Sequence, residues 1–211
     1  MTAGIIFMNM DDAFEKRKIE LVRLINELYK EKPAGWFKEK GDVYISTWDV
    51  GNEVDDIPPE KEEIIVRRSK KAYIIISTAL LVFILTLLYE YFNSPSIFFM
   101  LVIIPFACLF IYTFVLSYDR KPKIIINKKG IWLKETDCYY EWHIIGATYI
   151  KDEDRGEDTI RSLVIYYYEP AEHNFIKAEY KFPRLLDLSI PKIAYYIEYW
   201  KIKTGYRTPK A

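Results

Sequence analysis

Two stretches without any charged residue fill the middle of this 211-residue chain and constrain its fold more than any other feature. Asp, Glu, Lys and Arg are absent from residues 72–89 and 91–118, and Glu90 alone separates the two stretches. A helix rises about 1.5 Å per residue, so each stretch is close to the roughly 30 Å needed to cross a hydrocarbon core. We therefore predict two transmembrane helices, at about residues 72–90 and 97–118.

The segment between the two stretches contains Asn93-Ser94-Pro95-Ser96, which is typical of a turn, so we predict a hairpin. In the hairpin segment, residues 64–118, basic residues stand just before the first predicted helix. Others follow the second predicted helix, and none stands in the connection between the two. Because positive charge collects on the cytoplasmic side of membrane proteins, both termini are predicted to be cytoplasmic. A soluble protein with two buried helices is the alternative, but a chain of this length seldom has a core that buries two such runs.

The basic residues beside the hairpin are also the candidate functional residues. Each positive charge near an anionic membrane surface contributes about 1 kcal/mol of attraction, so contact with anionic lipid is one hypothesis for them. The alternative is that they only orient the hairpin. The set consists of Arg67, Arg68, Lys70, Lys71, Arg120, Lys121, Lys123, Lys128 and Lys129.

Residues 1–63 are predicted to form an N-terminal cytoplasmic segment. Apolar residues recur every three or four positions over residues 11–32, which predicts an amphipathic helix. Residues 42–48 favour a strand, and residues 51–63 form an acidic linker. The apolar side of the helix is expected to pack on the cytoplasmic domain, and contact with a partner or with the membrane surface is the alternative.

The pattern changes after the membrane segment, where short apolar runs alternate with turn residues and predict antiparallel strands. Two strong strands are expected over residues 162–168 and 175–182. An amphipathic helix follows at residues 189–204. Strands followed by one covering helix indicate an α+β protein whose residues 119–211 form a cytoplasmic β domain.

Three short pieces of the sequence carry a family resemblance: Ile64–Lys71 (IIVRRSKK), Ile124–Ile131 (IIINKKGI) and Tyr140–Ile145 (YEWHII). They resemble bacterial proteins in which a two-helix transmembrane hairpin precedes a pleckstrin-homology-like (PH-like) cytoplasmic domain. The resemblance covers residues 64–204. It implies an antiparallel half barrel, or a barrel closed by the C-terminal helix, in a multi-pass protein of the bacterial inner membrane, and it implies no activity.

No group of residues in the sequence forms a catalytic motif, so we expect a protein that is not an enzyme and needs no cofactor. His143 and His173 share no metal-ligand spacing with each other or with the two cysteines, and no metal site is predicted. The charged loop of residues 152–158 lacks the pattern of a calcium loop and is expected to be solvated. No ionisable residue stands in the middle of either span, which argues against an ion pathway.

The leading hypothesis is therefore a non-enzymatic membrane protein that presents a cytoplasmic PH-like domain for binding protein or membrane lipid. Its zero formal net charge does not favour nucleic acid as a partner, whereas self-association stays open. A membrane-anchored immunity protein, which neutralises a toxin of a neighbouring cell, is the alternative. Survival of toxin-exposed cells with and without this chain would decide between them. An enzyme whose site forms at the membrane surface is a third possibility.

Overall fold

The structure is a computed structural model that describes residues 14–25, 43–51, 58–59, 61–154, 159–172 and 174–206. A helix over residues 14–25 comes first. The named elements that follow are β1 (Val43–Ser46), α2 (Thr47–Gly51), β2 (Glu63–Val66), α3 (Lys70–Asn93), α4 (Ile97–Ser117), β3 (Ile124–Asn127), β4 (Gly130–Leu133), β5 (Cys138–Glu141), a 3-10 helix (Trp142–Ile144), β6 (Ile145–Asp154), β7 (Thr159–Glu169), β8 (Asn174–Lys181) and α5 (Ile190–Lys203).

The chain divides into two compact units. One unit, here called the hairpin unit, comprises Ile65–Lys123 and Pro183–Ser189. The other, here called the β domain, contains the described residues of the N-terminal segment together with Ile124–Phe182 and the chain from Ile190 onward. The β domain is thus assembled from sequence on both sides of the hairpin.

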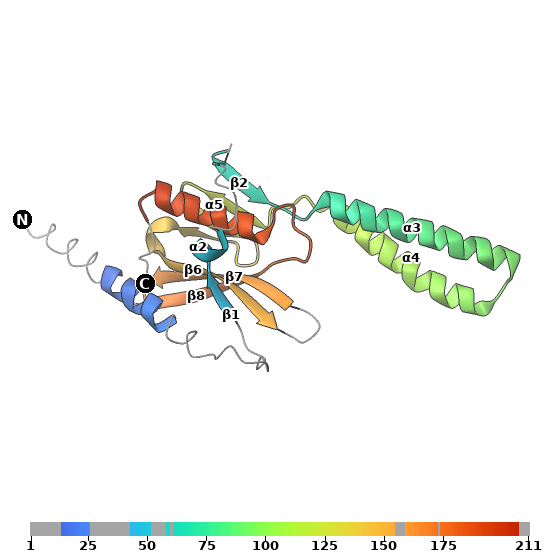
Figure 1. Cartoon of the computed structure of the whole chain (residues 1–211), viewed down its shortest axis with the longest axis horizontal. Helices are drawn as coiled ribbons and strands as arrows, with labels where there is room; N and C mark the ends of the chain where they lie inside the picture. The colour runs from blue at the N-terminus through green and yellow to red at the C-terminus, as the bar shows by residue number, and fades with distance from the viewer. Residues whose placement is uncertain are drawn as a thin grey trace, which may run out of the picture. The chain divides into compact units, whose positions relative to one another are not determined.

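Helices α3 and α4 form an antiparallel hairpin (Figure 1). Ser69 and Ser96 cap them, because each side chain accepts a hydrogen bond from a backbone N–H in the first turn. The Ser77 hydroxyl lies 3.0 Å from that of Thr113 and joins the helices. Both helices are long and apolar enough to cross a membrane, and only 11% and 6% of their most apolar windows are buried. The predicted spans are therefore helices, and their apolar surface is largely uncovered by the chain.

The strands form two separate four-stranded sheets, β1-β6-β7-β8 and β2-β3-β4-β5. Every strand pair whose register is described is antiparallel. The closed barrel that was one expectation is wrong for the described strands. The 3-10 helix Trp142–Ile144 separates β5 from β6, and β6 pairs instead with β1 from the N-terminal segment (Figure 1).

One local prediction also differs from the structure. Among the described residues of the strand expected over residues 42–48, only Val43–Ser46 form a strand, because the Ser46 hydroxyl accepts a hydrogen bond from the N–H of Trp48 at 3.2 Å and the chain turns into α2. The predicted helix over residues 11–32 is observed at residues 14–25, and its remaining positions lie outside the described residues, as does most of the linker at 51–63.

The N-terminal helix packs on the first sheet through its apolar side. Val22 and Ile25 are buried in one cluster with Ala147, Tyr149 and Val164, which belong to β6 and β7. At the start of the helix the Phe14 ring packs against aromatic residues of β7 and β8. The described part of residues 1–63 therefore includes a helix and a strand that belong to the β domain.

Helix α5 covers the β domain and runs within one residue of its predicted bounds. Its buried face includes Ile193, Ala194, Ile197 and Trp200, and it contacts both α2 and β3. Burial of such side chains contributes roughly 1.5–3 kcal/mol for each large apolar residue. The sequence pattern that predicted an amphipathic helix is thus explained by one face packed in the core.

Candidate functional site

A short segment returns from the end of the β strands to the base of the hairpin. Two hydrogen bonds join Arg67 and Asp187. The Arg67 N–H donates to the side-chain oxygen Asp187 Oδ1 at 2.8 Å, and the Asp187 N–H donates to the Arg67 carbonyl at 2.9 Å. The Ser69 N–H donates to the Leu185 carbonyl at 3.1 Å. These bonds fix the backbone that carries the first basic residues before α3.

A pocket of about 450 Å³ lies at this end of the hairpin. Five basic side chains and two carboxylates line it, which is a formal excess of three positive charges. All of its residues belong to the hairpin unit, from the approach to α3, the exit from α4 and the returning segment. They are Arg67, Arg68, Ser69, Lys70, Lys71, Ser117, Asp119, Arg120 and Asp187.

Two features of the pocket favour an anionic ligand. The Nε atoms of Arg67 and Arg68 are buried without a hydrogen-bond partner among the described residues, so two guanidinium donors are unused. Lys70 and Lys71 stand in the first turn of α3, where the helix dipole repels positive charge. The helix dipole therefore does not favour these lysines, and their charges add to the attraction of the pocket for an anion.

Asp119 is the main internal partner of the basic residues. Its Oδ2 accepts a hydrogen bond from Lys123 Nζ at 2.8 Å and lies 3.3 Å from Arg68 Nη1. The Lys123 ammonium lowers the pKa of the Asp119 carboxyl, burial opposes this, and the Lys121 N–H and the Arg68 charge lower it further. The carboxylate is therefore ionised across the physiological pH range and holds one arginine at the pocket wall.

We expect Asp119→Asn to destabilise the protein near neutral pH and to have little effect in acid. The pKa of Asp119 in the folded protein lies below its unfolded value of about 3.9, so the stabilisation is complete above about pH 4. It is lost as the pH falls through the lowered pKa. Thermal unfolding of both forms in one detergent at pH 7 and pH 3 measures the effect. A difference in Tm that stays constant between these pH values would contradict an origin in the ion pair.

The structure brings together five of the nine basic residues predicted from the sequence. Arg67, Arg68, Lys70, Lys71 and Arg120 all line the pocket. The others behave differently. Lys123 is buried against Asp119, Lys121 is exposed outside the lining, and Lys128 and Lys129 occupy the exposed turn between β3 and β4.

Sequence reasoning missed the two acidic members of the site. Asp119 stands two residues after the end of α4, so its place at the end of the hairpin was visible in the sequence. Asp187 gave no such signal, because it lies more than a hundred residues from Arg67 and is brought there by backbone pairing.

The described residues offer no constellation for metal or acid–base chemistry. No group of three or more His, Cys, Asp or Glu residues among them could hold a metal ion. His143 is half exposed, and its Nδ1 lies 3.1 Å from Glu141 Oε2, a surface contact. His173 and the tip of the charged loop at 152–158 lie outside the described residues. The pocket thus offers charged groups that can bind an ion.

No protein-family model, no curated protein and no solved structure matches the chain. The fold and the site define its class by themselves: an α+β protein with antiparallel sheets and two helices long and apolar enough to cross a membrane. The basic pocket lies where those helices begin and end.

Proposed function

We propose that this chain is a non-enzymatic protein of the bacterial inner membrane, anchored by α3 and α4 with both termini in the cytoplasm, whose juxtamembrane pocket binds the phosphate of an anionic phospholipid. The single observation that carries the proposal is the pocket itself. It gathers basic residues from the approach to α3, from the first turn of α3 and, with Arg120, from the exit of α4, and it includes two unused guanidinium donors.

The location of the pocket favours a lipid over a soluble anion. Its basic residues adjoin the first turn of α3 and the last turn of α4, which is the level of the headgroups in a membrane that contains the hairpin. Basic pockets on the cytoplasmic side of transmembrane helices are typical headgroup sites. Arginine also matches phosphate geometry, because its planar fork donates two parallel hydrogen bonds.

The β domain supports a PH-like module as the cytoplasmic part. The two sheets hold eight strands, of which seven, β2 to β8, lie in the part of the chain that ends with the covering helix α5. A full PH domain has seven strands, and β1 is an additional strand that pairs with β6. The motif residues also meet in space, since the Trp142 indole N–H donates to the Asn127 carbonyl at 2.9 Å. Such a domain would present lipid- or protein-binding surfaces to the cytoplasm.

The test compares two double variants that remove the same charge. Arg67→Gln with Arg68→Gln empties the pocket of two guanidinium groups, whereas Lys128→Gln with Lys129→Gln neutralises an exposed turn. At about 1 kcal/mol for each charge, the first variant should lose roughly 30-fold in affinity for phosphatidylglycerol. The second should lose much less. Native mass spectrometry of the purified full chain in nonionic detergent counts the phosphatidylglycerol molecules retained.

Phosphatidylcholine is the reference lipid in that experiment, because it carries a phosphate but no net negative charge. Equal losses in the two variants would mean that diffuse surface charge attracts the lipid and that the pocket plays no part. Equal retention of phosphatidylcholine and phosphatidylglycerol by the wild-type protein would also contradict the proposal. Circular dichroism of each variant checks that the fold is intact.

A further inference from the structure

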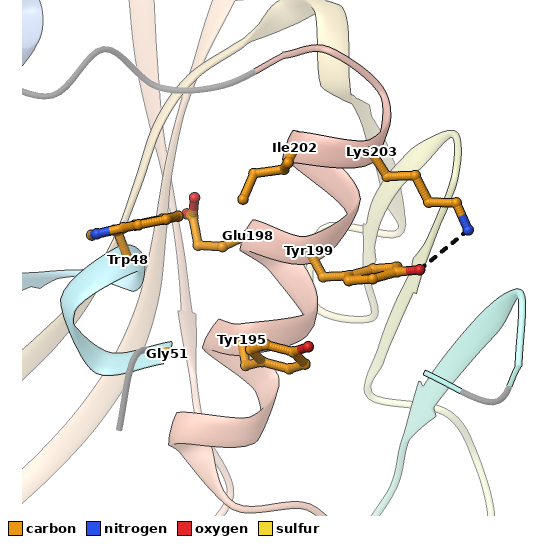
Figure 2. A pocket seen from close by; sticks show the side chains of 7 residues that line it. All are labelled: Trp48, Gly51, Tyr195, Glu198, Tyr199, Ile202 and Lys203. Atoms are coloured by element: carbon orange, nitrogen blue, oxygen red, sulfur yellow. Dashed lines mark hydrogen bonds between the residues drawn. The ribbon is translucent and has the colours of Figure 1, made fainter. Parts of the chain in front are cut away.

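A second pocket lies wholly within the β domain, between α2 and α5 (Figure 2). It is a groove of about 380 Å³, within the size range of sites for small molecules. Trp48 comes from α2, and Tyr195, Tyr199 and Ile202 come from α5. Three of the seven lining residues are aromatic, and Glu198 is the acidic residue among them.

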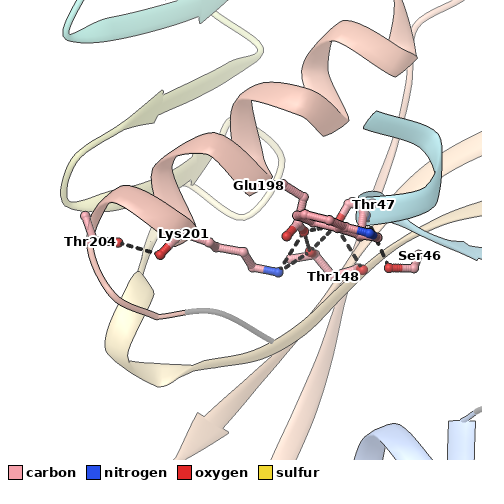
Figure 3. A network of polar contacts seen from close by, with 7 residues as sticks. Ser46, Thr47, Thr148, Glu198, Lys201 and Thr204 are labelled. Carbon is pink, nitrogen blue, oxygen red and sulfur yellow. Dashed lines mark hydrogen bonds and ion pairs between the residues drawn. The ribbon is translucent and has the colours of Figure 1, made fainter. Parts of the chain in front are cut away.

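Glu198 is held in place by a buried polar network (Figure 3). Its Oε1 accepts hydrogen bonds from the Thr47 hydroxyl and from Lys201 Nζ, the latter at 3.0 Å. Lys201 Nζ also donates to the Thr148 hydroxyl at 2.8 Å. The network connects α2, β6 and α5 and fixes the carboxylate before any ligand arrives. Such pre-organisation reduces the ordering cost of binding.

The carboxylate keeps one oxygen for a ligand. Glu198 is 6% exposed and lines the groove, and all hydrogen bonds that it makes with described residues use Oε1. Lys201 is only 2% exposed, and burial lowers its pKa, although the Glu198 charge raises it. Lys201 Nζ contacts Oε1 from the interior of the domain at 3.0 Å, and the hydrogen bonds between Glu198 and the described residues leave Oε2 unused.

The aromatic walls already attract one cation of the chain itself. The Lys203 ammonium lies 5.3 Å from the centroid of the Tyr199 ring and 4.9 Å from that of Trp200. It also donates to the Tyr199 hydroxyl at 3.2 Å. Ammonium groups bind the faces of aromatic rings through the ring quadrupole, and of the two rings only Tyr199 belongs to the groove wall. Lys203 lines the groove and would repel a second cation that entered it.

We propose that the groove between α2 and α5 binds a small organic ammonium ion, with Trp48, Tyr195 and Tyr199 around the cation and Glu198 as its counter-charge. Aromatic rings combined with one fixed carboxylate form the type of site that recognises alkylammonium groups. This site is independent of the lipid pocket, because the two share no residue.

The experiment uses choline and its neutral isostere 3,3-dimethyl-1-butanol, in which a carbon atom replaces the charged nitrogen. Isothermal titration of the full chain in nonionic detergent should show choline binding at least tenfold tighter than the isostere, within the range of desolvated cation–π contacts. Trp48→Leu should weaken choline binding at least fivefold. Lys203→Gln should strengthen it about threefold, because the competing charge is gone.

Glu198 needs a paired substitution, because its loss alone would leave Lys201 buried without its counter-charge. The double variant Glu198→Gln with Lys201→Met keeps the interior neutral and should abolish the preference for choline over its isostere. Equal binding of choline and the isostere by the wild-type protein overturns the proposal, and so does weaker choline binding in Lys203→Gln. Binding of an arginine peptide without any binding of choline also overturns it and would assign the groove to a protein partner.

Discussion

Val82→Arg is expected to abolish stable membrane association of the chain. Val82 lies near the middle of α3 and its side chain is 58% exposed on the hairpin surface. An arginine at the centre of a membrane span costs about 3 kcal/mol, roughly a hundredfold in the insertion equilibrium. On a surface in water the same substitution would change stability by no more than about 0.5 kcal/mol. Carbonate extraction of membranes from expressing cells should leave the wild type in the pellet and remove the variant.

Tyr89→Arg is the matched control, because Tyr89 is 67% exposed on the same helix but lies close to its end. A long basic side chain at that position can extend its charge to the headgroup region at little cost. The control should therefore remain in the membrane pellet. Full recovery of Val82→Arg in the pellet, or extraction of the wild type as a soluble protein, would show that α3 does not span the bilayer.

Gly130→Ala is expected to have the largest effect on the β domain. Gly130 begins β4 with φ +156°, and a Cβ atom there would lie 2.0 Å from the Tyr140 carbonyl oxygen and 2.8 Å from Glu141 Cα. Both contacts are with the backbone of the paired strand β5, which cannot move without breaking the ladder. We expect a loss of more than about 3 kcal/mol, as for other severe steric clashes in well-packed sites.

Gly205→Ala provides the comparison, because Gly205 also has positive φ, at +82°, but a Cβ atom there meets nothing within 4 Å. Only the backbone strain of about 1–2 kcal/mol remains in that variant. Thermal unfolding followed by near-ultraviolet circular dichroism should show a clearly lower Tm for Gly130→Ala. Equal Tm values for the two variants would mean that the close approach of β4 to β5 is not required.

The sequence predicted the elements whose cause is local. The hairpin follows from two uncharged runs, and α5 follows from apolar spacing and its glycine stop, so both appear within two or three residues of their predicted bounds. The strands β7 and β8 were also expected, since β-branched and aromatic residues mark them. In each case the type and spacing of neighbouring residues explain why the helix or strand forms.

The other features of the structure depend on contacts between residues that lie far apart in the sequence. β1 joins β6 over about a hundred residues, and the returning segment with Asp187 meets Arg67 over a similar distance. The basic residues of the pocket could be predicted, but the two carboxylates that complete it could not both be found. The groove was missed for the same reason, because Trp48 and Glu198 meet only after α2 and α5 have packed.

The division of the β domain by the hairpin has a consequence for biosynthesis. β1 and β2 leave the ribosome before α3 and α4, but their partner strands β6 and β3 are made only afterwards. Neither sheet can be completed while the apolar helices are still being synthesised. The hairpin is therefore synthesised completely before any folded β domain exists, and the β domain matures last.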